Sequence, residues 1–514
     1  MSGLSVHGAD LISDCVIDMA KWPLAMAAAI GDDLDNDQNG ETAVKRQLLA
    51  LGFGLAATPA MAACDDLRAL ALPAATVTEA GVVSSLTIGG VAVPLARPAC
   101  RVLVTARPSA DSDVRIAVVM PEGAAWNGKF VQVGNGGFAG QIPWFLITLA
   151  LSKGYAAAGT DDGHQDPDGT SAKWALGHPE KVIDFGWRAV KTTTDVAKAV
   201  IAAHGPAPSR NFFFGCSDGG REALMTAQRY PRDFDGIVAG APAWPWTRML
   251  GIAGEVVRES LLPGRSLPAT KLPALQAAAL AACGKGERYI ADPRACRFDP
   301  GVLACKGGDS ATCLMPGEVK TARLLYNGRR DPITGKPFPG LRPGAEALPG
   351  SWGSWGRAAG SDPTAEATSR GFPWNHFAYL VKEDPRFDLR TLTDADIRAG
   401  HKRWAGTLNA DNPDLRAFRA AGGKLLSYHG WNDPAISPGL SLEYRAAARK
   451  ATPGLDASYR LFMVPGMLHC SGGDAPVTVD WLTVLDQWVA TGTAPQTLTA
   501  THGDGRTQVL VAEK

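Results

Sequence analysis

The chain has 514 residues, of which 46% are hydrophobic and 20% charged, as in an ordinary globular protein. Because single hydrophobic cores stop growing near about 250–300 residues, this length predicts one catalytic domain that carries a large insertion. Lys and Arg together number 51, as do Asp and Glu, so the formal net charge is zero. With no long basic or acidic run, the sequence argues against a nucleic-acid partner and favours a small or neutral substrate.

Residues 1–63 have the features of a leader. Lys45-Arg46 precedes the apolar stretch from Leu48 to Ala57, and Ala60-Met61-Ala62 follows the A-x-A pattern of a signal-peptide cleavage site. We therefore predict a signal peptide over residues 45–63 and a secreted or periplasmic protein. The alternative is a cytosolic protein with a buried apolar helix here. No other stretch is long and apolar enough to predict a membrane span.

Removal of the leader would take away Cys15 and leave an even number of cysteines. The remaining eight are Cys64, Cys100, Cys216, Cys283, Cys296, Cys305, Cys313 and Cys470. An even count in an exported chain favours disulfides over metal ligation, and no C-x-x-C pair argues for zinc. The count alone leaves about a hundred possible pairings.

The first part of the predicted catalytic domain is rich in strands. We expect strands near residues 76–88, 91–95, 115–120, 129–133 and 156–160, followed by a helix over 190–203. A glycine-dense loop at 134–140 follows one of these strands. There the backbone must turn sharply or approach a ligand closely.

A short apolar strand at 211–214 leads into the sequence G-C-S-D-G at 215–219, and a helix is expected over 221–229. A strand, a tight turn that carries serine and a following helix make up the nucleophile-elbow arrangement. We therefore predict that Ser217 is a nucleophile; the alternative is a structural turn. Gly236 to Pro242 is expected to form the next strand.

The sequence pattern of parallel strands is interrupted between about Trp244 and Ala421. This stretch is rich in Pro, Gly and Trp and holds four of the cysteines. We predict a lid inserted over the carboxyl ends of the strands, with a separate packing domain as the alternative. The chain then divides into a catalytic core at 64–243 and 422–514 and a lid insertion at 244–421.

Two late strands, expected at 424–428 and 459–464, lead into loops that hold Asp433 and His469. Serine, acid and histidine follow one another in the chain order of an α/β-hydrolase triad. His469 would remove the Ser217 proton while Asp433 fixes the imidazole tautomer. The alternative for Asp433 is a turn-forming residue before proline. A final helix, with apolar residues at helical spacing from 481 to 489, is expected to pack on the sheet.

Three other histidines are assigned supporting roles. His429 is interpreted as a structural or substrate-lining residue, and His164 and His178 as residues that hold loops in place.

Cys216 directly precedes Ser217, and Cys470 directly follows His469. A disulfide between them would tie the nucleophile to the base, whose atoms must lie within about 2.6–3.2 Å for proton transfer. The oxyanion also needs preorganised N–H donors. The N–H of Asp218, next to the nucleophile, and that of Gly137, in the glycine-dense loop, are the natural pair; the alternative for the loop is a plain tight turn.

Together these motifs resemble the tannase and feruloyl esterase family, which also includes the bacterial hydrolase of terephthalate half-esters. The resemblance spans roughly residues 64–500. It rests on the motifs at 126–130, 134–138, 177–186, 215–225, 230–231 and 234–242, and on the cysteines beside Ser217 and His469. It implies an α/β-hydrolase fold with a large inserted lid, a triad of Ser217, Asp433 and His469, and oxyanion donors at Gly137 and Asp218.

The resemblance also implies how the cysteines pair. The pairs are Cys216–Cys470 beneath the triad, Cys64–Cys100, Cys283–Cys296 and Cys305–Cys313. In relatives the lid carries a calcium loop rich in aspartates. The corresponding stretch here, 283–293, is shorter, nearly empty of carboxylates and carries Lys285 and Arg288, whereas calcium takes about 6–8 oxygen ligands. We therefore expect weak calcium binding or none, and no other cofactor.

The expected function is that of a secreted serine carboxylic-ester hydrolase with small-molecule aromatic esters as substrates. The resemblance implies a gallate, a feruloyl or other hydroxycinnamoyl ester, or a terephthalate half-ester. Candidate ring-stacking residues in the lid are Trp352, Trp355, Phe372 and Trp374, with lid core as the alternative role of each. A serine peptidase and a non-catalytic binding protein on the hydrolase scaffold stay open as alternatives.

Overall fold

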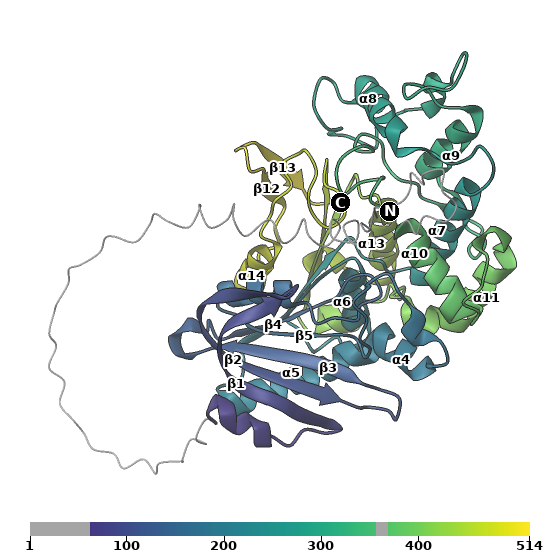
Figure 1. Ribbon diagram of the computed structural model, residues 1–514. Helices are drawn as coiled ribbons and strands as arrows, with labels where there is room; N and C mark the ends of the chain where they lie inside the picture. Colours follow the sequence, from purple (N-terminus) through teal and green to yellow (C-terminus); the bar gives the residue numbers. More distant parts are fainter. Residues whose placement is uncertain (1–61, 356–367) are drawn as a thin grey trace, which may run out of the picture. The chain divides into compact units, whose positions relative to one another are not determined.

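A nine-stranded mixed sheet forms the centre of the protein (Figure 1). The computed structural model describes residues 62–355 and 368–514, so the predicted signal peptide lies outside the described residues except for its last two positions. The strand order is β1-β2-β3-β5-β4-β6-β7-β10-β11. The strands are β1 (Ala75–Ile88), β2 (Val91–Ala106), β3 (Val114–Pro121), β4 (Lys129–Val133), β5 (Ala156–Thr160), β6 (Arg210–Cys216), β7 (Gly236–Gly240), β10 (Lys424–Gly430) and β11 (Tyr459–Val464).

The last six strands in this order run parallel, and the first three join them as an antiparallel edge. All residues of β5 and β7 are buried, as expected of parallel strands that are covered on both faces. In contrast, β1 alternates between exposed and more buried positions, which is typical of an antiparallel strand with one solvated face.

Alternate residues of β3 enter two hydrophobic clusters. Ile116 and Val118 belong to the cluster that contains side chains of α5 (Ala189–His204), α6 (Asp218–Arg229) and α13 (Gly439–Ala451). Ala117 and Val119 belong to the one that contains side chains of α3 (Trp144–Ser152) and α14 (Trp481–Thr491). Because successive side chains of a strand point to opposite faces, helices cover both faces of the sheet. This is the arrangement expected of an α/β hydrolase.

A long segment between β7 and β10 contains most of the remaining helices (Figure 1). They are α7 (Trp246–Ser260), α8 (Leu272–Cys283), α9 (Pro316–Asn327), α10 (Thr368–Asn375), α11 (Asp394–Leu408) and α12 (Arg416–Ala420), with the small β8–β9 pair (Arg329–Arg330, Pro337–Phe338). The segment builds two small clusters of its own, one around α8 and α9 and one between α7 and α11. Its position corresponds to the predicted insertion.

The strands predicted at 129–133, 156–160 and 459–464 coincide with β4, β5 and β11, and the predicted last helix with α14. Features that were not predicted include α3, α4 (Pro179–Ile183), α13 and the hairpin of β12 (Thr497–Thr501) and β13 (Thr507–Val511). The hairpin is joined to the sheet by a bridge between Ala512 and Phe462 of β11. None of the helices in residues 62–355 and 368–514 combines the length and hydrophobicity needed to cross a bilayer.

Candidate active site

Ser217 occupies the sharp turn between β6 and α6. Its backbone has φ +64°, a region that side-chain-bearing residues seldom adopt. Strand and helix pass so close that a Cβ on Gly215 would lie 2.2 Å from the Gly219 carbonyl oxygen, and one on Gly220 would lie 2.2 Å from that of Gly240. Only glycine fits these positions, which is why the elbow requires its small residues.

Three residues from different loops form a hydrogen-bonded chain. His469 Nε2 lies 2.9 Å from Ser217 Oγ, and His469 Nδ1 lies 2.8 Å from Asp433 Oδ2. Since a carboxylate only accepts, Nδ1 carries the hydrogen and Nε2 is left to accept from the serine hydroxyl. The three residues predicted for the triad are thus brought together in the order that proton transfer requires.

Asp433 is held ionised by its surroundings. Its Oδ1 accepts hydrogen bonds from the backbone N–H groups of Ala435 (2.8 Å) and Ile436 (2.9 Å). Burial alone would raise the pKa of this carboxyl, but the facing imidazoles of His469 and His429 outweigh burial and lower it. Asp433 therefore remains a carboxylate at neutral pH.

His429 is a second imidazole on this carboxylate, a role that the sequence did not reveal. It is fully buried, and its Nε2 lies 3.2 Å from Asp433 Oδ2 and 3.1 Å from the Ile436 carbonyl oxygen. Both partners are acceptors, so Nε2 carries the hydrogen, and Nδ1 accepts from the Ser441 hydroxyl at 2.7 Å. His429 thus orients Asp433 and does not contact Ser217.

The structure forms all four of the implied disulfides. Cys216–Cys470, with its Cα atoms 6.0 Å apart, connects the neighbours of Ser217 and His469. The others are Cys64–Cys100, Cys283–Cys296 and Cys305–Cys313.

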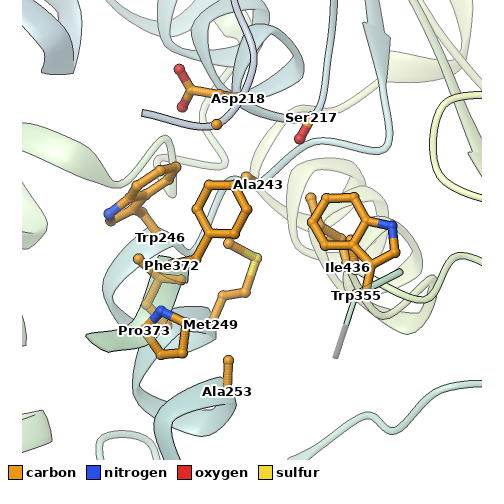
Figure 2. Close-up of a pocket in the computed structure, with 13 residues that line it drawn as sticks. Ser217, Asp218, Ala243, Trp246, Met249, Ala253, Trp355, Phe372, Pro373 and Ile436 are labelled. Atoms are coloured by element: carbon orange, nitrogen blue, oxygen red, sulfur yellow. The ribbon is translucent and has the colours of Figure 1, made fainter. Parts of the chain in front are cut away.

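Gly137, Ser217 and Asp218 line the same pocket, and Figure 2 shows Asp218 next to Ser217. Asp218 begins α6, where the first N–H groups have no partner within the helix and the helix dipole favours negative charge. Gly137 has φ +62°, and a Cβ there would lie 2.3 Å from the Gly169 carbonyl oxygen. Phe138, the residue after Gly137, is held in place by His164, whose Nε2 lies 2.7 Å from the Phe138 carbonyl oxygen.

The pocket is lined mainly by apolar side chains (Figure 2). Its lining consists of Gly137, Ser217, Asp218, Ala243, Trp246, Met249, Leu250, Ala253, Trp355, Phe372, Pro373, Ala435 and Ile436. Of the four aromatic candidates in the lid, Trp355 and Phe372 reach it. Trp352 packs on Tyr326 inside the insertion, and Trp374 packs on Tyr379.

Trp355 and Phe372 stack on each other with ring centroids 6.0 Å apart. Trp355 also meets the His469 ring edge to face, at 4.9 Å between centroids and 79° between planes. The insertion therefore places an aromatic ring directly against the histidine of the triad. Trp246 and Met249, at the start of α7, complete the apolar wall and were not predicted; their only sequence signal is that they follow β7.

The remaining predicted supports lie outside the pocket. His164 stacks on Trp174 with centroids 3.9 Å apart, and burial lowers its pKa to about 3, so it stays neutral. His178 Nδ1 lies 2.9 Å from Asp111 Oδ1.

Two groups of potential metal ligands occur within the described residues. The sulfurs of Cys64 and Cys100 are consumed by a disulfide, so their proximity to Glu122 makes no site. Asp162, Asp218 and Glu222 form a buried group, but Arg221 already binds Asp218. The stretch at 283–293 contributes to neither group, and the expectation of weak or no calcium binding stays a prediction.

Comparison with known proteins identifies the family of the chain. The family model for tannase and feruloyl esterase matches residues 100–512. The chain belongs to this family. An uncharacterized esterase from Xanthomonas campestris pv. campestris is 36% identical to it over 520 residues, covering 90% of this chain and 88% of that protein. A probable feruloyl esterase from Arthroderma benhamiae is 33% identical over 432 residues, covering 79% of each chain.

A solved structure supports the same assignment. The crystal structure of an esterase from Aspergillus oryzae superposes with a TM-score of 0.79 at 26% identity, over 87% of this chain and 95% of that one. The α/β-hydrolase fold is thereby confirmed. As a member of the tannase and feruloyl esterase family, the protein is a carboxylic ester hydrolase that acts on small-molecule esters.

Proposed function

We propose that the protein is a secreted serine esterase that cleaves esters of aromatic acids through an acyl-enzyme on Ser217. The observation that carries the proposal is the hydrogen-bonded chain from Ser217 through His469 to Asp433, which opens into a pocket walled by aromatic rings. An activated hydroxyl next to an apolar pocket is suited to acyl transfer from a hydrophobic acid.

In the first half-reaction Ser217 Oγ attacks the ester carbonyl carbon while His469 Nε2 takes the hydroxyl proton. The tetrahedral oxyanion accepts hydrogen bonds from the N–H groups of Gly137 and Asp218. When the intermediate collapses, the alcohol oxygen receives the proton from His469 and leaves. Water then attacks the acyl-enzyme with His469 as base, which releases the acid and restores the serine.

The acid is proposed to be aromatic. Trp355, Phe372 and Trp246 offer ring faces and edges to a planar acyl group, and such ring pairs contribute about 0.5–1.5 kcal/mol beyond simple burial. Gallate, feruloyl or other hydroxycinnamoyl esters and terephthalate half-esters all meet this description. The feruloyl esterase name of the Arthroderma benhamiae relative supports the same class.

Export is proposed from two independent features. The sequence predicts a signal peptide at 45–63, and the described residues hold four disulfides. Such bonds persist in oxidising compartments and are rare in the cytosol.

The decisive experiment is an assay of the purified protein, with Ser217→Ala as the matched control, on methyl gallate, methyl ferulate, chlorogenate, a terephthalate half-ester and peptide substrates. We expect turnover of at least one aromatic ester, a stoichiometric acyl adduct on Ser217 by mass spectrometry, and loss of both in the variant. Hydrolysis of peptides alone would identify a peptidase. Tight binding without turnover would identify a binding protein.

A further inference from the structure

Behind the predicted oxyanion hole lies a buried group of three carboxyls with one cation. Asp162 follows β5, while Asp218 and Glu222 lie in the first turns of α6, and one carboxyl oxygen from each lies within 4.8 Å of the others. The Arg221 guanidinium binds Asp218 through Nε (2.5 Å) and Nη2 (3.2 Å). Arg221 thus balances the negative charge of Asp218, and the carboxyls of Asp162 and Glu222 are left facing each other.

Asp162 and Glu222 are both fully buried, at 0% and 1% exposure. Among the described residues, neither oxygen of Asp162 nor the Oε1 of Glu222 has a donor within normal hydrogen-bond geometry, although the Asn135 side chain lies near enough to lower the pKa of Asp162. Two carboxyls can bond each other only when a proton lies between them, and two ionised carboxylates in such a site would repel strongly. Asp162 also has φ +62°, so its backbone is held in a strained conformation that directs the side chain to this place.

Glu222 is connected to the loop that carries Gly137. Its Oε2 accepts a hydrogen bond from the Asn135 N–H at 3.1 Å and lies so near Gly134 that a Cβ there would come within 2.4 Å. The other polar groups of Asn135 are also fixed: its carbonyl oxygen accepts from the Gly219 N–H at 2.7 Å, and its Nδ2 donates to the Thr160 carbonyl oxygen at 2.8 Å. Asn135, which follows β4, therefore links the end of β5 to the start of α6, two residues before Gly137.

We propose that Asp162 and Glu222 share a proton and act as positioning residues, which hold the 134–137 loop so that the Gly137 N–H points at the oxyanion. The inference rests on the proposed serine esterase mechanism. Removal of the shared proton would create two adjacent buried carboxylates, push Glu222 away from Asn135 and misplace the donor. The pair does not touch the substrate.

Burial is the main reason that both carboxyls favour the protonated form. It raises the pKa of Glu222 to about 7 and that of Asp162 well above the ordinary range. The charged groups that act on the pair are Asp218, which raises both pKa values, and Arg221, which lowers that of Glu222; both lie on α6. From the β4 side the uncharged Asn135 lowers both pKa values through its hydrogen-bond donors, without outweighing burial. The pair thus retains a proton at neutral pH and loses it in alkaline solution.

Amide variants reproduce the protonated pair. In Glu222→Gln, the amide oxygen can accept from Asn135 while its NH₂ donates to Asp162; in Asp162→Asn, the NH₂ donates to Glu222. With 4-nitrophenyl acetate as substrate, kcat of the wild type should fall at alkaline pH, and both amide variants should shift this limb upward by one pH unit or more. Glu222→Ala, which removes the acceptor for Asn135, should lower kcat at least tenfold at every pH with KM nearly unchanged, since the oxyanion forms only in the transition state.

Glu346→Gln is the matched control, because Glu346 is a buried carboxyl with a raised pKa inside the insertion, bound to Tyr326 Oη at 2.6 Å. It should leave the pH profile of kcat unchanged. An alkaline limb that is identical in the wild type and both amide variants would overturn the proposal, as would an unaltered kcat in Glu222→Ala. If the alanine variant does not fold, the near-isosteric amides still decide the matter.

A second readout needs no activity. At pH 8 exposed carboxyls are ionised, so a protonated carboxyl should give an infrared C=O stretch that shifts in D₂O. Its intensity should decrease in the double variant Asp162→Asn/Glu222→Gln relative to the wild type. Equal intensity in the wild type and the double variant would contradict the shared proton even if Ser217 proved to be the nucleophile. A lower intensity in the double variant would support the shared proton even if Ser217→Ala remained active.

Discussion

The disulfide between Cys216 and Cys470 joins the residue before Ser217 to the residue after His469, across 254 positions of sequence. It is a direct covalent connection between the two loops whose side chains must exchange a proton. Without it, the 2.9 Å separation of His469 Nε2 and Ser217 Oγ depends on packing alone.

We therefore expect Cys216→Ala/Cys470→Ala to lower kcat at least tenfold under conditions where circular dichroism still reports a folded chain. Loss of such a bond also typically destabilises a protein by about 2–5 kcal/mol, so kcat and denaturant unfolding should be measured on the same samples. The matched control is Cys305→Ala/Cys313→Ala, which opens a bond that spans 8 positions in the insertion. Equal kcat losses in the two double variants would contradict a specific role.

His429 should support catalysis through Asp433. His429→Leu removes a donor from the carboxylate, so kcat should fall about tenfold with little change in KM, because a hydrogen bond to a charged group contributes about 1.5–3 kcal/mol. His429→Gln, which can still donate, should recover part of the loss. Steady-state kinetics across pH would test this, and an unchanged kcat in His429→Leu would show that Asp433 needs no second imidazole.

Ionised Asp433 should contribute to both activity and stability in a pH-dependent way. Asp433→Asn should reduce kcat by about 10⁴, because it favours the wrong tautomer of His469. The folded-state pKa of this carboxyl lies below its usual value, so its stabilising contribution is present above about pH 4 and is lost as pH falls through the lowered pKa. The difference in free energy of unfolding between wild type and variant should therefore shrink from pH 6 to pH 3, as denaturant titrations would show.

Replacement of the two tryptophans in the 352–355 stretch should affect different properties, activity for Trp355 and stability for Trp352. Trp355→Ala removes a pocket wall, so kcat/KM for methyl ferulate should fall about tenfold, while hydrolysis of 4-nitrophenyl acetate changes little. Trp352→Ala should instead destabilise the protein by about 3–5 kcal/mol, since Trp352 is 2% exposed and packs on Tyr326. Equal losses on both esters in Trp355→Ala would argue against an acyl pocket at this ring.

Calcium is expected to be dispensable. Lys285 and Arg288 occupy the stretch at 283–293, and Arg288 pairs with Asp474 at 2.7 Å, so a cation already neutralises this neighbouring carboxylate. Exhaustive dialysis against EGTA should leave both activity and the unfolding temperature unchanged. Loss of activity that is restored by added calcium would overturn this expectation.

The sequence predicted best what depends on local pattern. The elbow at Ser217 follows from its glycines and from the strand and helix that flank it, and Asp433 and His469 follow from chain order at the ends of late strands. The contact of His429 with Asp433 depends on how the 430–436 loop folds back, and no spacing rule reports it. Likewise, Trp355 and Trp352 are equivalent in sequence, and only packing separates a pocket wall from a core residue.

Three of the disulfides pair cysteines that follow one another along the chain, whereas Cys216–Cys470 encloses four other cysteines. A chain that emerges from its amino end exposes Cys216 long before its partner has been made, with Cys283 the next thiol to appear. Maturation must keep Cys216 from forming that nearer bond or undo it afterwards. The yield of active enzyme is therefore expected to depend on a disulfide isomerase, and the segment with His469 and Cys470, synthesised after Ser217 and Asp433, completes the active site.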